Sequence, residues 1–319
     1  MNPLSAIYAA GVRLRNESYD RGVLLSQKLA GPVISIGSIS AGGAGKTPFV
    51  IFLGEFLQAQ GVCFDVLSRG YGRKSRGVRL VAANGSPAEY GDEPLLIARR
   101  LGCPVIVGEN RFEAGRLAEK QFGAQLHLLD DGFQHRALER DLNVVLLTAD
   151  DLADTLLPVG RLREPIRALE RADVVALEEG IDGASVPVIP KRIWRVRRGI
   201  RLRGISEAPV VFCGIARPKR FFDQLAAIGV RAVAHKTYSD HHAYTEADVD
   251  DLLQLARANH ADGFITTEKD AMNLGERLDR LGDVTVAQVT LEIEPGNALD
   301  AVLRLLALGE PPHEKIRSQ

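Results

Sequence analysis

The residues best suited to chemistry form a glycine-rich segment between the apolar run Val33–Ile36 and a segment with a helical pattern. In such a strand–loop–helix unit, backbone N–H groups of the loop and of the helix N-terminus point at phosphate oxygens. Lys46 would contact the β- and γ-phosphates, and the Thr47 hydroxyl would hold Mg²⁺. Ser40 stands where the general pattern has glycine, so a glycine-rich surface turn is the alternative. We predict a nucleotide phosphate-binding loop made of Ser40, Ala41, Gly42, Gly43, Ala44, Gly45, Lys46 and Thr47.

Two carboxylates end a second apolar run, Leu126–Asp130, at Asp130 and the adjacent Asp131. A strand-terminal aspartate beside a phosphate loop holds Mg²⁺ or a water bound to it. The chain continues with the polar residues Gln134 and His135, which would lie at the carboxyl end of the sheet. Open α/β sheets bind their ligands at that edge. The combination predicts a metal ligand at Asp130.

A third acidic position, Asp92, opens a predicted helix and is followed by Glu93. Phosphoryl transfer to an alcohol needs a group that accepts the hydroxyl proton, and Asp92 is a candidate. The alternative is that Asp92 only caps the helix, since aspartate is a preferred N-cap residue. The residues alone leave both interpretations open.

Basic and histidine-containing segments supply further candidates. Arg69 and Tyr71 lie in a loop whose glycines allow close approach to a ligand, although a mobile basic loop is the alternative. In the segment Arg161–Glu164, Arg161 and Arg163 could neutralise a transferring phosphate, with Glu164 as their partner. His241 and its neighbour His242 follow an aspartate but lack a regularly spaced third zinc ligand. We therefore favour a histidine that orients a carboxylate over a metal site or a surface loop.

The bulk composition excludes several classes of protein. The chain has 319 residues, enough for about two domains, with 45% hydrophobic and 25% charged residues, as in ordinary globular proteins. The net charge of −1 does not favour nucleic acid as a partner. Three widely spaced cysteines suggest a reducing compartment. No run approaches the ~20 apolar residues that span a bilayer.

Short apolar runs alternate with helical patterns, which predicts a parallel α/β sheet in each of two domains. We expect a nucleotide-binding domain at residues 1–190, a strand-like linker at 191–207 rich in arginine, and a smaller α/β domain at 208–319. The predicted strands are Val33–Gly37, Cys63–Ser68, Val105–Gly108, Leu126–Asp130, Leu142–Leu147, Val174–Leu177, Val210–Cys213, Ala232–Ala234, Gly263–Thr267 and Val284–Val289. The predicted helices are Lys46–Ala59, Glu93–Leu101, Arg111–Gln121, Lys219–Ile228, Glu246–Ala258 and Ala298–Leu306.

The N-terminus carries an amphipathic pattern, with Leu4, Ile7, Tyr8 and Val12 at helical spacing and several arginines nearby. An amphipathic helix flanked by basic residues can lie in a membrane interface. The alternative is a helix packed on the domain surface, as most amphipathic helices are. Positive charges follow the apolar residues, which is the wrong order for a secretory signal.

Taken together, these segments resemble the tetraacyldisaccharide 4′-kinase family, the membrane-associated lipid A kinases. The resemblance covers nearly the whole chain and depends on motifs that appear in order. They are Ser40–Pro48, Arg69–Arg73, Gly91–Pro94, Leu129–His135, Leu162–Pro165, Phe212–Ala216, Asp240–His242 and Thr267–Asp270. The resemblance implies a P-loop NTPase-like, mostly parallel sheet with helices on both faces and a second, smaller α/β domain that closes over the site.

The resemblance also implies roles for individual residues. The reaction would transfer the γ-phosphoryl group of ATP, with Mg²⁺, to the 4′-hydroxyl of an acylated glucosamine disaccharide 1-phosphate. Asp92 matches the family's proposed base, and His241 matches the residue that pairs with it. Lys46 keeps its catalytic phosphate contact, and Thr47, Glu93 and Asp130 become expected Mg²⁺ ligands. Less certain contacts to substrate or phosphate are Arg69, Tyr71, Asp131, Gln134, His135, Arg161, Arg163 and Glu164.

A lipid acceptor makes an interfacial role for the N-terminal helix more plausible, because the enzyme must meet its substrate at the membrane. Anionic headgroups would add about 1 kcal/mol per basic residue near the surface. The resemblance therefore implies a peripheral protein on the cytoplasmic face of the bacterial inner membrane. Its expected partners are the lipid substrate and an anionic membrane interface, with no nucleic acid and no obligate protein partner.

Overall fold

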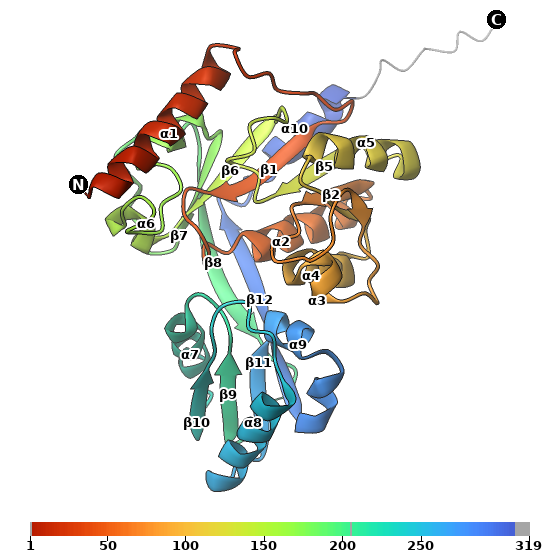
Figure 1. The fold of residues 1–319 in the computed structure, drawn as a ribbon, viewed down its shortest axis with the longest axis vertical. Helices are drawn as coiled ribbons and strands as arrows, with labels where there is room; N and C mark the ends of the chain where they lie inside the picture. Colours follow the sequence, from red (N-terminus) through yellow and green to blue (C-terminus); the bar gives the residue numbers. More distant parts are fainter. Residues whose placement is uncertain (1, 205, 310–319) are drawn as a thin grey trace, which may run out of the picture.

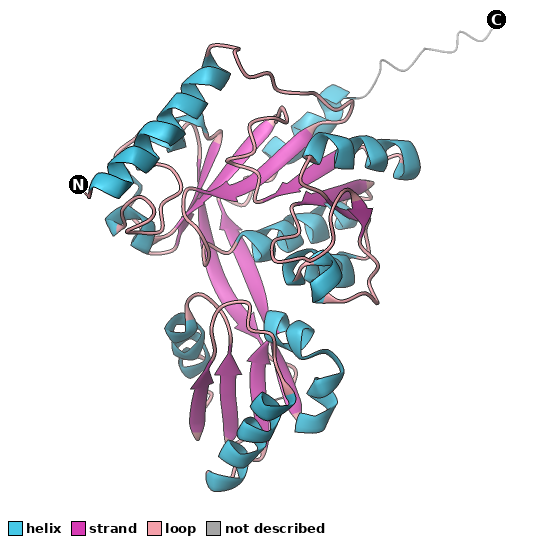
Figure 2. Cartoon of the chain, in the orientation of Figure 1, coloured by secondary structure: helices cyan, strands magenta, loops and turns pink. Residues whose placement is uncertain are grey.

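A computed structural model of the chain describes residues 2–204 and 206–309. One twelve-stranded sheet runs through both halves of the molecule, in the order β10-β9-β11-β12-β8-β7-β6-β1-β5-β2-β4-β3. Helices cover both of its faces (Figure 1, Figure 2). All neighbouring strand pairs in the described chain are parallel except β3–β4 and β8–β12. The predicted fold class, a mostly parallel α/β sheet, is confirmed.

We call residues 3–192 together with the C-terminal helix α10 (Asp300–Gly309) the larger half. Its strands are β1 (Val33–Ser38), β2 (Phe64–Ser68), β3 (Arg79–Leu80), β4 (Val105–Val107), β5 (Leu126–Asp130), β6 (Leu142–Leu147) and β7 (Val174–Glu178). Its other helices are α1 (Pro3–Asp20), α2 (Lys46–Ala59), α3 (Pro87–Tyr90), α4 (Asp92–Leu101), α5 (Arg111–Phe122), α6 (Ala149–Ala153) and the 3₁₀ turns η1 (Ile166–Arg171) and η2 (Gly183–Ser185).

The smaller half comprises residues 206–283. It contains β9 (Pro209–Cys213), β10 (Ala234–Thr237), β11 (Gly263–Thr267), α7 (Pro218–Ala227), α8 (Glu246–Ala258), α9 (Glu268–Leu274) and η3 (Gly275–Leu281). Two long antiparallel strands, β8 (Ile193–Arg201) and β12 (Val284–Glu294), connect the halves (Figure 1). We call this pair the bridge.

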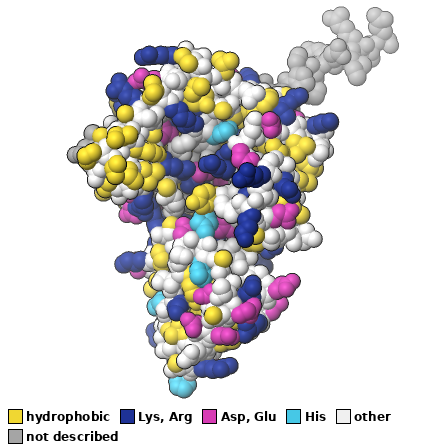
Figure 3. Space-filling view, viewed as in Figure 1, with side chains coloured by type: hydrophobic (Ala, Val, Ile, Leu, Met, Phe, Trp, Pro, Cys, Tyr) yellow, Lys and Arg dark blue, Asp and Glu magenta, His cyan; other side chains and the backbone are white. Residues whose placement is uncertain are grey.

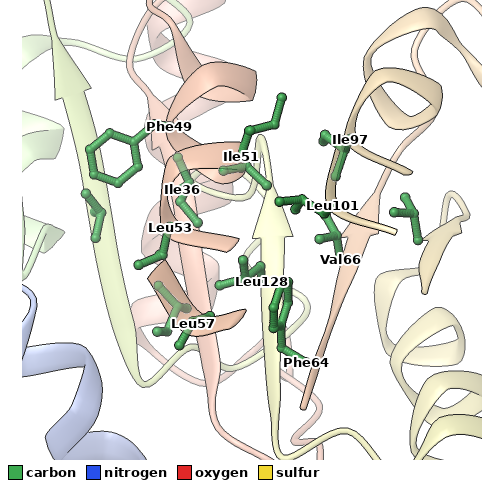
Figure 4. Packing of buried hydrophobic residues seen from close by; sticks show 14 of the residues in the cluster. Ile36, Phe49, Ile51, Leu53, Leu57, Phe64, Val66, Ile97, Leu101 and Leu128 are labelled. Carbon is green, nitrogen blue, oxygen red and sulfur yellow. The ribbon is translucent and has the colours of Figure 1, made fainter. Parts of the chain in front are cut away.

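The core of the larger half explains why the phosphate loop has a rigid base. Every residue of β1 is buried, and helix α2 packs on the sheet through Phe49, Leu53 and Leu57 (Figure 4). Phe49 also stacks on Trp194 of β8, with ring centroids 6.3 Å apart. Truncating a buried phenylalanine of this kind typically costs about 3–5 kcal/mol. The helix that follows the loop is therefore fixed both to the sheet and to the bridge.

Several elements differ from the predicted ones, and tertiary pairing explains most of the differences. Strand β12 continues beyond the predicted Val289 to Glu294, because its second part alternates polar and apolar residues and pairs with β8. Strand β10 begins at Ala234, about where its predicted counterpart ends. Helix α9 was not predicted, and it begins after Thr267, whose side chain accepts the N–H of Asp270. Helix α1 is longer than predicted and extends to Asp20.

The predicted domain boundaries at 190/191 and 207/208 stay a prediction. Part of the predicted linker forms strand β8 of the sheet, and helix α10 contributes Val302 to the core cluster that contains Phe49. Helix α10 thus contacts the larger half, although the prediction groups it with the smaller domain. Residues 1, 205 and 310–319 of the predicted ranges lie outside the described residues.

Candidate active site

The predicted phosphate loop connects β1 to α2 and needs its glycines for backbone reasons. Gly42, Gly43 and Gly45 have φ angles of 70°, 68° and 84°, in the left-handed region that residues with a Cβ avoid. Gly45 is the N-cap of α2, so the first N–H groups of that helix are free of side-chain capping. Free N–H groups and the positive end of the helix dipole favour an anion here. The loop has the geometry that its sequence predicts.

Arg163 holds the loop from the side. Its guanidinium donates to both oxygens of Asp131 at 2.8 and 2.9 Å and to the carbonyl of Ser40 at 2.8 and 3.0 Å. Lys46 Nζ lies 3.6 Å from the Asp131 carboxylate. Burial alone would raise the pKa of Asp131, but Lys46 and Arg163 lower it to about 2. Asp131 is therefore an ionised anchor for the two cations beside the loop.

A second set of contacts supports the end of β1. Gln134 donates to the carbonyl of Ser38 at 3.0 Å and to Glu164, whose side chain is buried. Glu164 also accepts hydrogen bonds from Arg171 and from Asn16 of α1. These contacts give Gln134 and Glu164 a supporting position behind the loop. The side chain of Arg161 is turned away, pairing with Asp154 at 2.8 Å, while its carbonyl accepts the N–H of Ala41.

Asp130 lies at the end of β5, buried beside the loop. One carboxylate oxygen accepts from Ser68 at 2.9 Å, and the other, Oδ1, is buried without a hydrogen-bond partner. Burial, and then the nearby charges of Glu93 and Asp131, raise the pKa of Asp130 to about 7. A buried carboxylate with an unused oxygen in an acidic surrounding is well suited to a cation. Asp130 and the buried Thr47 therefore fit a Mg²⁺ ion bound with nucleotide phosphates.

Asp92 faces the smaller half. It is the first residue of α4, after the N-cap Gly91, and its Oδ1 accepts the N–H of Glu93 at 3.0 Å. Asp92 Oδ2 lies 2.8 Å from His241 Nδ1 and 3.6 Å from Lys269 Nζ. Lys269 also contacts His241 Nε2 at 3.2 Å and Asp240 at 2.8 Å. These four side chains form one network across the gap between the halves.

The contacts in this network favour the charged forms of both Asp92 and His241. Burial by itself would raise the pKa of Asp92, but the His241 hydrogen bond and the Lys269 charge outweigh it, and the pKa is lowered. The hydrogen bond to Asp92 raises the pKa of His241. A lysine that donates to Nε2 favours the tautomer in which Nδ1–H donates to Asp92. Asp92 is thus an ionised, oriented carboxylate.

His241 occupies a backbone conformation that is uncommon for its type, with φ of 58°. Conformations of this kind cluster at functional sites, because the surrounding structure must impose them. The ring of Tyr71, from the predicted glycine-flanked loop, lies 5.5 Å from the His241 ring. The loop of the larger half that carries Arg69 and Tyr71 therefore approaches the same network.

A cavity of about 190 Å³ lies between the phosphate loop, the bridge and the smaller half. Gly42 to Thr47 and Glu93 line one side, and His241 and Lys269 line the other. Its apolar surface comes from the bridge, from α4 and from the loop and helix after β9. The apolar lining residues include Leu96, Ile200, Ile215, Phe221 and Val289. A pocket with an apolar part and a phosphate loop has the mixed character that a nucleotide requires.

A cationic region lies beside Asp130 and Asp131 on the larger half. Arg111 is buried. Burial, and then the nearby charge of Arg69, lower the pKa of Arg111 to about 10. His135 is held neutral, because burial and the charges of Arg111 and its neighbours lower its pKa to about 4. The region therefore combines a neutral imidazole with cations, as an anionic acceptor would require.

Helix α1 packs on the larger half through polar side chains and exposes apolar ones. Its polar side chains dock on the larger half: Ser5 donates to the carbonyl of Leu156, and Tyr8 donates to the carbonyl of Arg163. Its apolar side chains Leu4, Ile7 and Leu14 are 60–70% exposed. Apolar side chains gather over this helix in Figure 3. No helix within residues 2–204 and 206–309 is long and apolar enough to cross a membrane.

Sequence comparisons agree with this geometry. The family model described as Tetraacyldisaccharide-1-P 4'-kinase matches residues 1–307. The chain belongs to this family. A tetraacyldisaccharide 4'-kinase of Koribacter versatilis is 46% identical over 96% of the chain and 98% of that protein. One of Geobacter metallireducens is 37% identical over 94% of the chain and 95% of its own length.

A solved structure is similar as well. It is described as the "apo" form of LpxK from Aquifex aeolicus in complex with ATP, and it is 30% identical to this chain. The TM-score is 0.76, over 96% of this chain and 97% of the other. The predicted family and the fold class are therefore confirmed.

Two residues of the site were not assigned from the sequence. Lys269 lies in the quoted Thr267–Asp270 segment, but nothing local indicated that its side chain would contact Asp92. Arg111 starts helix α5 and looked like an ordinary helix residue. A lysine directly after a strand-terminal Thr-Glu was the only sequence signal for Lys269, and Arg111 offered none.

Proposed function

We propose that this chain is an ATP-dependent kinase that phosphorylates the 4′-hydroxyl of a tetraacylated glucosamine disaccharide 1-phosphate, a step of lipid A biosynthesis. The observation that carries the proposal is the position of Asp92. It is an ionised carboxylate held by His241 and Lys269, and these two side chains line the same cavity as the phosphate loop. Family membership supplies the class of acceptor.

The phosphate loop would bind the triphosphate through its backbone N–H groups, and Lys46 would contact the β- and γ-phosphates. Thr47, Asp130 and Glu93 would hold Mg²⁺, which would neutralise charge on the β- and γ-phosphate oxygens. Arg163 and Asp131 keep Lys46 in place from behind. Fixed positive groups of this kind stabilise charge on the transferring phosphoryl group without reorganising.

The 4′-hydroxyl would give its proton to Asp92 as its oxygen forms a bond with the γ-phosphorus and the bond to ADP breaks. The proton and the phosphoryl group thus both find acceptors within the cavity. His241 would hold the carboxylate in position and stabilise it through Nδ1–H. Lys269 would keep His241 in that tautomer and tie the smaller half to Asp92.

The acceptor would lie against the cationic region of the larger half. Arg69, Arg111 and His135 would contact its phosphate and sugar groups, and Tyr71 would cover it beside His241. We further propose that the smaller domain closes over this site and excludes water, which limits wasteful ATP hydrolysis.

The lipid acceptor would be met at a membrane surface. The exposed Leu4, Ile7 and Leu14 would enter the headgroup region, while the polar face of α1 stays docked on the larger half. Of the nearby arginines, Arg13 is paired with Glu17, and Arg15 donates to the carbonyl of Gln134. The apolar side chains therefore support the membrane contact more strongly than the arginines do. We propose a peripheral location on the cytoplasmic face of the inner membrane.

Phosphate transfer from labelled ATP to the disaccharide lipid in mixed micelles tests the activity, with a soluble glucosamine sugar as the control acceptor. We expect label on the lipid and none on the sugar. Equal transfer to the soluble sugar, unaffected by detergent, would instead indicate a kinase for a small metabolite.

Liposome flotation tests the membrane contact. Replacing Leu4, Ile7 and Leu14 together by serine should reduce binding to anionic liposomes, since each buried apolar side chain contributes about 1.5–3 kcal/mol. Nucleotide binding should stay at its wild-type level, because these side chains lie outside the cavity. Unchanged flotation would exclude α1 as the membrane contact.

A further inference from the structure

Two arginines from outside the larger half reach the phosphate loop. Arg198 lies in the middle of bridge strand β8, and Arg217 is the N-cap residue of α7 in the smaller half. Both line the cavity together with Lys46 and Thr47. Arg217 lies beside Gly43 of the loop, and Arg198 lies beside Gly45.

Arg198 is a cation without compensation. Within the described chain it forms no ion pair, and its buried Nε has no hydrogen-bond acceptor. Burial, followed by the charge of Arg217, lowers its pKa to about 10, with no carboxylate acting in the other direction. One guanidinium nitrogen lies 3.4 Å from the point where a Cβ on Gly45 would stand. The guanidinium therefore touches the loop at its last glycine.

Arg217 approaches the loop at Gly43. Its Nε lies 2.8 Å from the point where a Cβ on that glycine would stand, and both Nε and Nη2 are buried without a hydrogen-bond acceptor. Nη1 forms an ion pair with Asp150 at 3.3 Å, and Nη2 lies 3.7 Å from Asp151. Nε, the guanidinium nitrogen nearest to Gly43, has neither a hydrogen bond nor an ion pair within the described chain.

Two other arginines line the same cavity but are compensated. Arg100 pairs with Glu55 and Glu268, and Arg220 pairs with Glu178. A buried guanidinium with no partner is costly, and proteins keep such groups where a ligand supplies the missing charge. Arginine is also the side chain that best matches phosphate oxygens with its planar set of donors.

We propose that Arg198 and Arg217 bind the polyphosphate of the nucleotide, so that the bridge and the smaller half complete the phosphate site of the larger half. This inference rests on the proposed function, because that function supplies the polyphosphate. Arg217 would link binding of the phosphates to the position of the smaller half. Arg198 would link binding of the phosphates to the position of the bridge.

Calorimetric titration of the full chain with ATP and with adenosine tests the proposal, using Arg198→Met and Arg217→Gln. We expect the Kd for ATP to rise by about 10- to 100-fold in each variant, as for loss of charged hydrogen bonds, and the Kd for adenosine to change by less than about twofold. Arg197→Met is the matched control. Arg197 is the next residue of β8, is exposed, and pairs with Glu179 at 3.0 Å.

Thermal unfolding without nucleotide gives a second readout. Removing an unpaired, partly buried cation should leave the melting temperature of Arg198→Met at or above that of the wild type, because the desolvation cost disappears. A lower melting temperature with unchanged ATP affinity would overturn the proposal in favour of a structural role. Equal loss of ATP and adenosine affinity would also overturn it, since the arginine would then shape the nucleoside pocket.

ATP binding is measured without an acceptor, so the two proposals fail separately. A chain that binds ATP, loses that binding in the variants and phosphorylates no lipid would contradict the proposed function and uphold the phosphate contacts. If the chain phosphorylates the lipid and both variants keep the wild-type ATP affinity, the proposed function is upheld and the phosphate contacts of the two arginines are contradicted.

Discussion

The two sides of the cavity are built in different ways. On the larger half, the functional groups are the backbone of the phosphate loop and short carboxylates, held by local ion pairs such as Arg163 with Asp131. The smaller half reaches the site with long side chains that contact the larger half directly: His241 and Lys269 at Asp92, and Glu268 at Arg100. Under the proposed function, the larger half supplies the reacting groups and the smaller half positions them. Substitutions on the two sides should separate these roles.

The largest effect is expected on the larger-half side, at Asp92. Asp92→Asn keeps the size of the side chain but removes its capacity to accept the hydroxyl proton. We expect kcat to fall by about 10²- to 10⁴-fold, the usual contribution of a positioned base. ATP affinity should stay at the wild-type level in the same preparation. Near-normal turnover would exclude Asp92 as the base.

His241 should matter less than Asp92, because it acts through that carboxylate. His241→Ala should lower kcat by about 10- to 100-fold, as a misplaced catalytic group does. The adjacent His242→Gln is the matched control, since His242 pairs with Asp248. A loss at His241 as large as that at Asp92 would contradict a purely positioning role for His241.

Lys269 should have a smaller effect than His241, because it contacts Asp92 from a longer distance. Lys269→Met removes a charge that lowers the pKa of Asp92, so the carboxylate becomes harder to keep ionised in its buried position. We expect a loss in kcat of about tenfold, as for one hydrogen bond to a charged group, with partial recovery in Lys269→Arg. Identical activity of the Met and Arg variants would show that the charge has no part in the effect.

The smallest effect is expected at the contact between Glu268 and Arg100. Glu268→Gln removes the ion pair between α9 and α4 but leaves Arg100 paired with Glu55. Such partly exposed pairs contribute about 0–1 kcal/mol, so kcat/KM should fall by no more than about fivefold. A much larger loss would mean that this single contact decides how the halves meet.

Several elements could be predicted because their signals are local. The strand Val33–Gly37, the glycines after it and the helix from Lys46 follow from an apolar run, backbone requirements and helical spacing. Strand β12 illustrates the limit. Its second part, residues 288–294, alternates polar and apolar residues, a strand signal that our prediction missed, but only the structure shows that β8 is its partner.

In the candidate site, too, local sequence signals place some residues, and only the structure shows the contacts of others. Lys46, Thr47 and Asp130 could be placed from the sequence, because a strand end or a loop motif fixes each one relative to its own element. Helix α1 was predicted as amphipathic, but only its docked polar face shows that Leu4 and Ile7 point outward.

The phosphate loop, the family and most of the groups that can do chemistry follow from the sequence alone, because backbone conformation and motif order depend on neighbouring residues. Which of these groups meet depends on the tertiary structure. Asp92 joins Lys269, and Arg217 reaches Gly43, across the gap between two halves that are far apart in the chain. Such contacts depend on how the bridge places the smaller half, and no local pattern encodes that placement.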